Sequence, residues 1–137
     1  MTRLYRYLPI FICLLLVGCG SNDGRLPLSG TVTLDGQAMA SGSIVFVPLG
    51  GGPATGGSIE GGKFQIPAER GPVAGNYRVE IVSYESTGEM LDDPDLPGQK
   101  VEQRRQIIPD RYNKQSELSL QVTAETAKNA EFPLTSE

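Results

Sequence analysis

The feature that most constrains the fold of this 137-residue chain is a series of short alternating runs separated by glycine and proline. In segment 28–34, apolar residues and glycine alternate with serine and threonine, which is the period of a strand with one buried face. Glycine occurs 17 times and proline 10 times, and both residues mark turns between strands. The sequence therefore predicts an all-β protein.

Seven segments carry strand-like patterns, and each is short. They are 28–34, 43–49, 55–59, 63–67, 76–84, 118–122 and 129–135. Asp35-Gly36 and Gly61-Gly62 supply turns between them, since glycine tolerates a positive φ. Seven antiparallel strands predict a single β-sandwich, with core positions that include Phe64, Tyr77 and Phe132. Transthyretin-like and immunoglobulin-like strand orders both fit the pattern, and it does not choose between them.

The N-terminus has the composition of a targeting segment. Arg3 and Arg6 precede an apolar stretch over 8–17, which is about half the length that a membrane-spanning helix needs. The stretch ends in Leu16-Val17-Gly18-Cys19, which resembles the lipobox of bacterial lipoproteins at all four positions. This resemblance implies a signal peptide over 1–18, a lipidated flexible tether over 19–26 and a folded domain over 27–137. An ordinary secretory signal and an uncleaved anchor are the alternatives.

Cys19 is the one residue for which the lipobox resemblance implies a definite chemical role. Its sulfur would carry a diacylglyceryl group and its new amine an acyl chain such as palmitate, which together hold a protein firmly on a lipid bilayer. The expected location is the cell envelope, facing the periplasm or the exterior. Gly20 stands where some bacteria use aspartate as an inner-membrane retention signal, so the outer membrane is favoured.

Composition excludes several classes of function. The net charge is −4, and it falls to −6 once Arg3 and Arg6 leave with the signal peptide, with 10 basic and 16 acidic residues remaining. This acidic balance argues against nucleic acid as a partner. The chain has no histidine, and its two cysteines are Cys13 in the leader and Cys19, so serine–histidine catalysis and ordinary zinc sites are excluded. No enzyme activity, cofactor or metal is expected.

Three ordered motifs resemble the carboxypeptidase regulatory-like, or transthyretin-like, domain. They are the run 28–48, Gly61-Gly62-Lys63-Phe64 and 75–79, and the segment 108–113 looks like a further signature of short lipoproteins with this domain. The resemblance covers residues 27–135 and implies a β-sandwich used for folding, docking or spacing at the envelope. Hydrolases of this fold use histidines and a C-terminal Tyr-Arg-Gly-Ser, and this chain lacks both.

The segment 85–106 is polar, contains two prolines and two glycines, and has no sustained period. It is predicted to be a long exposed loop and the contact surface of the protein. Asp92, Asp93 and Asp95 in it do not match the spacing of a calcium-binding loop, so a solvated acidic stretch is favoured. The basic residues Lys100, Arg104 and Arg105 are likewise interpreted as a solvated face rather than as ion-pair partners.

Two tyrosines are candidate ligand contacts. Tyr84 ends a predicted strand and Tyr112 follows the long loop, whereas Tyr77 is in phase with the core. Two functions remain open at this point. The first is a membrane-anchored, non-catalytic binding or scaffolding module with an envelope protein as partner. The alternative is a carbohydrate-binding module at the cell surface that uses Tyr84 and Tyr112 to contact polysaccharide.

Overall fold

The computed structural model describes residues 23–137, so the predicted signal peptide 1–18 and Cys19 lie outside the described residues. No helix in the described part is long and apolar enough to cross a membrane. The strands are β1 (Leu28–Leu34), β2 (Gln37–Ala38), β3 (Ser41–Pro48), β4 (Thr55–Glu60), β5 (Lys63–Ile66), β6 (Gly75–Val82), β7 (Tyr84–Asp92), β8 (Lys100–Gln106), β9 (Ser119–Val122) and β10 (Ala130–Leu134). Three 3-10 turns join them: η1 (Ala68–Arg70), η2 (Asp110–Tyr112) and η3 (Thr126–Lys128).

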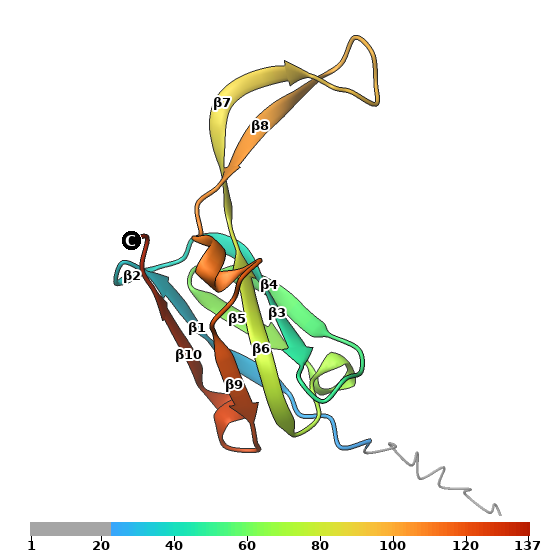
Figure 1. The fold of residues 1–137 in the computed structure, drawn as a ribbon, viewed down its shortest axis with the longest axis vertical. Coiled ribbons are helices and arrows are strands. Elements are labelled where there is room, and N and C mark those ends of the chain that lie inside the picture. Colours follow the sequence, from blue (N-terminus) through green and yellow to red (C-terminus); the bar gives the residue numbers. More distant parts are fainter. Residues whose placement is uncertain (1–22) are drawn as a thin grey trace, which may run out of the picture.

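The body of the protein is one sheet with the strand order β10-β1-β5-β4-β3-β6-β9, and β2 pairs with β1 (Figure 1). All seven segments predicted as strands lie in this path, so the all-β prediction is confirmed. The two tight turns form as expected. Asp35 and Gly36 have φ of 52° and 80°, and Gly61 and Gly62 have φ of 55° and 77°. Two successive positive φ values produce the turn that matches the twist of a hairpin.

The first and last strands of the body run parallel, which the purely antiparallel prediction had wrong. β1 pairs with β10 from Gly30↔Ala130 to Leu34↔Leu134. No tight turn joins these two strands, so local sequence does not set their relative direction. Gly30 allows the close approach, because a Cβ at this position would overlap the Ala130 carbonyl oxygen.

The sheet curls around three aromatic rings. Phe46 on β3, Phe64 on β5 and Phe132 on β10 have ring centroids 5.8–6.2 Å apart. β10 and β3 are separated by three other strands along the sheet, so their rings can meet only if the sheet folds back on itself. The shortest ladder along this path joins β4 and β5, which share only two residue pairs. The predicted core positions Phe64, Tyr77 and Phe132 are confirmed, since each is at most 5% exposed.

The segment 84–106 differs from its prediction. It is a two-stranded antiparallel hairpin of β7 and β8, which projects from one end of the body, and we call it the arm (Figure 1). The prediction of a loop was wrong because it relied on alternation. Every residue of β7 is exposed, so no buried face imposes an apolar period on the sequence.

The Gly30 contact yields a stability prediction with a matched control. We expect Gly30→Ala to lower the free energy of unfolding by about 3 kcal/mol, because the added methyl group would push β10 away from β1. Gly50→Ala should change it by less than about 1 kcal/mol, since no atom lies within 4 Å of the added Cβ there. Urea unfolding of both variants measures the difference. Equal stabilities would contradict the parallel pairing of β1 and β10.

Candidate functional site

The arm is the most distinctive feature of the described surface, and it is firmly attached at its base. Ser83, between β6 and β7, is only 4% exposed. Its hydroxyl donates to the Ser41 carbonyl at 2.6 Å, and its amide donates to Gln106 Oε1 at 3.0 Å. The Ile107 amide donates to the Ser83 carbonyl at 3.0 Å. Both strands of the arm are therefore tied to the body at the point where they leave it.

The segment that returns from the arm to the body is anchored as well. Ile108 is 3% exposed and belongs to the core. The buried Asn113 side chain donates from Nδ2 to the carbonyls of Ile108 and Pro109, both at 3.0 Å. The motif 108–113, singled out in the sequence, thus closes a turn and has a structural use in this protein.

Charged residues pair across the arm. Lys100 Nζ lies 3.1 Å from Asp92 Oδ1, and Arg105 forms an ion pair with Glu85. Lys100 and Arg105 are exposed to solvent as predicted, but the prediction that they form no ion pairs was wrong. Both pairs are exposed to solvent, so each contributes at most about 1 kcal/mol. The main effect of these two ion pairs is to select the register in which β7 and β8 pair, and their contribution to the stability of the protein is small.

A bulge interrupts the ladder halfway along the arm. Ser86 pairs with Arg104 and Met90 with Glu102, so three residues of β7 face one residue of β8. Gly88, with φ of 77°, occupies the centre of the bulge. The Ser86 hydroxyl accepts the Gly88 amide at 3.1 Å. Bulges bend and twist a hairpin, and β7 curves visibly over the body (Figure 1).

The acidic cluster shapes the tip of the arm. Asp93 Oδ1 accepts the amides of Asp95 and Leu96 at 2.8 and 3.2 Å, and Asp92 is paired with Lys100. Two of the three carboxylates therefore have local partners that explain their position. Within residues 23–137, no group of three or more potential metal ligands converges.

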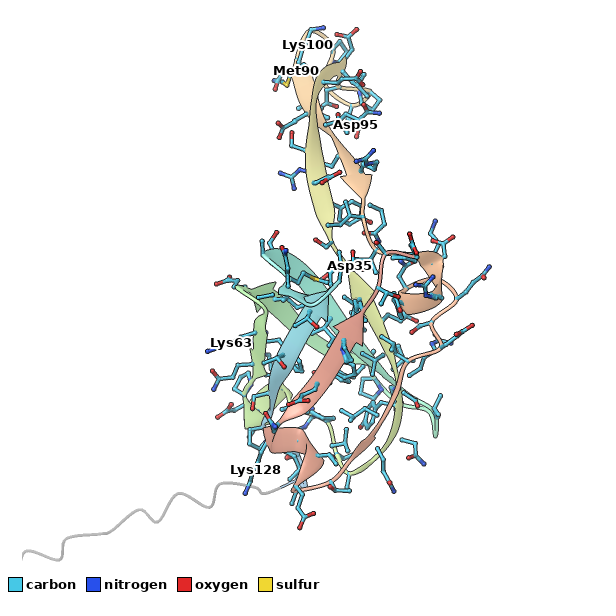
Figure 2. All side chains as sticks on the ribbon, turned by 90° about the vertical axis from the view of Figure 1, so that its left-hand side faces the viewer. Asp35, Lys63, Met90, Asp95, Lys100 and Lys128 are labelled. Carbon is cyan, nitrogen blue, oxygen red and sulfur yellow. The ribbon has the colours of Figure 1, made fainter. Side chains whose placement is uncertain are left out.

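The outer half of the arm exposes apolar side chains that the sequence analysis missed. Met90, Leu91, Leu96 and Val101 are 53%, 47%, 51% and 38% exposed. Figure 2 shows Met90 on the outer part of the arm, together with Asp95 and Lys100. Leu91 pairs directly with Val101, so these two side chains lie together on one face of the hairpin. In the sequence, the only signal for these side chains is that several apolar residues occur within an otherwise polar segment.

The two edges of the arm are open. In the described chain β7 pairs only with β8, and β8 only with β7. Each outer edge therefore presents backbone N–H and C=O groups without a strand partner, which is a template for pairing with another chain. The arm thus combines open edges with exposed apolar side chains on one projecting element.

The candidate tyrosines do not form a common platform. Tyr84 is 54% exposed and borders a hollow of about 300 Å³ at the base of the arm, lined also by Met39, Ser41 and Ile107. Tyr112 lies in η2 and does not line this hollow. The Arg111 guanidinium lies 4.7 Å from the Tyr112 ring centre and covers one face of that ring.

Tyr112 and Asp35 hold the C-terminal residues to the body. The Tyr112 hydroxyl lies 3.2 Å from the Thr135 hydroxyl, and this hydrogen bond, with the nearby Arg111, lowers the pKa of Tyr112. The Ser136 amide donates to Asp35 Oδ1 at 2.9 Å and lowers the pKa of Asp35. The Asp35 contact is therefore retained at neutral pH, and weakens as the pH falls through the pKa of the folded state.

The base of the arm generates a prediction about stability. We expect Ser83→Ala to lower the free energy of unfolding by about 1–2 kcal/mol, because it removes the buried hydroxyl that donates to Ser41. Ser86→Ala, on the exposed part of the arm, should change it by less than about 0.5 kcal/mol. Urea unfolding of the two variants compares them. A loss at Ser86 as large as that at Ser83 would mean that the arm, rather than its base, stabilises the body.

The chain was compared with protein-family models, with curated proteins and with solved structures, and none of the three comparisons found a match. The lipobox and the resemblance to carboxypeptidase regulatory-like domains therefore remain predictions from the sequence.

Proposed function

We propose that this chain is a lipid-anchored, non-catalytic protein of the bacterial envelope that docks a partner protein through the arm. The observation that carries the proposal is the arm itself, an anchored hairpin with open edges and four exposed apolar side chains. The arm projects from the end of the body opposite to the one where the described chain begins (Figure 1). A bilayer attached through Cys19 and a partner bound to the arm would thus occupy opposite ends of the molecule.

The expected mode of docking is strand addition. An isolated two-stranded hairpin gains little from its own side chains, and a third strand would supply ladder hydrogen bonds and cover apolar surface. β7 is nine residues long, enough to pair with a strand of ordinary length. The exposed Leu91 and Val101 side chains would then contact side chains of the added strand.

For the body we propose a two-layer sandwich of the carboxypeptidase regulatory-like type. One layer is β10-β1-β5 and the other is β4-β3-β6-β9. The weak pairing between β4 and β5 supports this division. The contact of Phe46 with Phe64 and Phe132, which would come from opposite layers, also supports it.

The carbohydrate-binding alternative has less support. It requires aromatic rings that are exposed together, whereas Tyr84 and Tyr112 share no hollow and Arg111 covers one face of the Tyr112 ring. Absence of polysaccharide binding by the full chain is therefore expected, and binding that depends on Tyr84 would restore this alternative.

The anchor is tested by a single substitution in full-length protein expressed in bacteria. Cys19→Ser removes the acceptor sulfur, so we expect the protein to leave the detergent-soluble membrane fraction and to lose incorporation of labelled palmitate. Cys13→Ser, in the predicted leader, is the matched control and should keep both properties. If Cys19→Ser protein stays in the membrane fraction without incorporating palmitate, an uncleaved helix holds it there and the lipoprotein proposal is wrong.

The docking role is tested by removing the arm along its own ladder. Replacing residues 85–105 with Asn-Gly leaves Tyr84 paired with Gln106 across a two-residue turn and keeps the Gln106 contact with Ser83. We expect this variant to remain folded and membrane-bound. It should lose the envelope protein that is cross-linked to the intact chain in cells and identified by mass spectrometry.

A point variant separates the apolar contact from the length of the arm. Leu91→Ser with Val101→Ser should reduce the cross-linked partner several-fold while leaving stability nearly unchanged, since both side chains are exposed. Lys63→Ser, at an exposed position of β5 outside both the arm and the loops 48–54 and 71–76, is the control and should retain the partner. Cross-linking that survives removal of the arm would place the docking surface elsewhere.

A further inference from the structure

The described chain enters the domain beside two loops. Arg25 forms a bridge with Val73, and its guanidinium donates to the Gly71 carbonyl at 3.3 Å. The Leu26 amide donates to the Pro72 carbonyl at 2.8 Å. The chain is therefore fastened to the loop 71–76 before β1 begins. Whatever precedes Arg25 must approach the body at this end.

The two loops at this end carry no charge. Residues 48–54 and 71–76, which we call the tether-end loops, contain no Asp, Glu, Lys or Arg. They lie against each other, since the Leu49 amide donates to the Asn76 carbonyl at 2.9 Å. Residues of both loops line one hollow on this end of the body. The tether-end loops thus form one continuous uncharged surface.

This surface is also apolar. Leu49 is 63% exposed and Val73 is 48% exposed. In the described residues, the other exposed large apolar side chains all lie on the arm. The arm mixes them with ion pairs such as Asp92–Lys100, whereas the tether-end loops do not. An uncharged apolar surface is what the boundary between lipid headgroups and acyl chains accepts.

The sequence keeps this surface close to the predicted anchor. Five residues separate Cys19 from Arg25. Even fully extended, that segment spans only about 20 Å. A domain attached through Cys19 would therefore hold the tether-end loops within reach of the bilayer at all times, and no comparable limit brings the arm near it.

We propose that the tether-end loops insert Leu49 and Val73 into the lipid interface, so that the domain stands on the bilayer by this end and directs the arm away from it. The inference rests on the lipid anchor proposed above and adds a defined orientation. Arg25, Glu69 and Arg70 flank the surface, and Asp23 forms an ion pair with Arg25 at 2.7 Å. Insertion therefore depends on the apolar side chains more than on anionic lipid.

The absence of tryptophan from the sequence makes the test direct. Leu49→Trp places a single reporter on the tether-end loops, and Leu96→Trp places one at the tip of the arm, at sites that are 63% and 51% exposed. The full lipidated chain is reconstituted into phosphatidylcholine vesicles. We expect the Leu49→Trp emission to shift to shorter wavelength and to be quenched by brominated lipid, with acrylamide quenching reduced at least about three-fold. Leu96→Trp should stay accessible to acrylamide and insensitive to brominated lipid.

Flotation of the vesicles separates the two proposals. If the protein floats with the vesicles but acrylamide quenches Leu49→Trp as strongly as Leu96→Trp, the proposed insertion is wrong and the anchor stands. If the protein does not float with the vesicles, the proposed lipid anchor is wrong, and the insertion that rests on it is wrong as well. Shielding of Trp at 96 by brominated lipid would overturn the proposed orientation. A Leu49→Trp protein that also carries Val73→Ser should show a smaller blue shift than Leu49→Trp alone if both loops insert.

Discussion

The contact of Phe46, Phe64 and Phe132 is the constraint on which the rest of the structure depends. Phe46 and Phe132 come from strands with three others between them along the sheet, and they meet only because the sheet curls back on itself. In this curled sheet β10 pairs in parallel with its neighbour β1, and Gly30 leaves room there for the Ala130 carbonyl oxygen. Burial of aromatic surface stabilises the closure, because each ring removes a large apolar area from water.

The body provides a buried core beneath an element that has no core of its own. The arm has a ladder, exposed ion pairs and a capped tip, and these interactions are each weak in water. Its attachment is stronger, since Ser83 is buried and hydrogen-bonded to Ser41 and Gln106. A hairpin that is hydrogen-bonded to the body at its base keeps its position while its open edges remain accessible. This combination suits a docking element.

The two apolar surfaces differ in a way that suits two different environments. The tether-end loops are uncharged and adjoin the point where the chain enters the domain. The arm places its apolar residues among ion pairs and polar side chains, as protein interfaces do. The proposed arrangement, with lipid at one end and a protein partner at the other, follows from this difference in charge and from the five residues that separate Cys19 from Arg25 in the sequence.

Local alternation by itself determined the strands of the body, because a half-buried strand must place apolar residues at every second position. The pairs Asp35-Gly36 and Gly61-Gly62 likewise determined the two tight turns through their positive φ. Alternation could not reveal β7 and β8, since neither strand has a buried face, nor the parallel pairing of β1 with β10, since no turn links them. Lipidation of Cys19 is a sequence prediction that the described residues do not reach. Only the tertiary structure decided which ends of the molecule carry the arm and the tether-end loops, because that arrangement depends on how the sheet closes around its core.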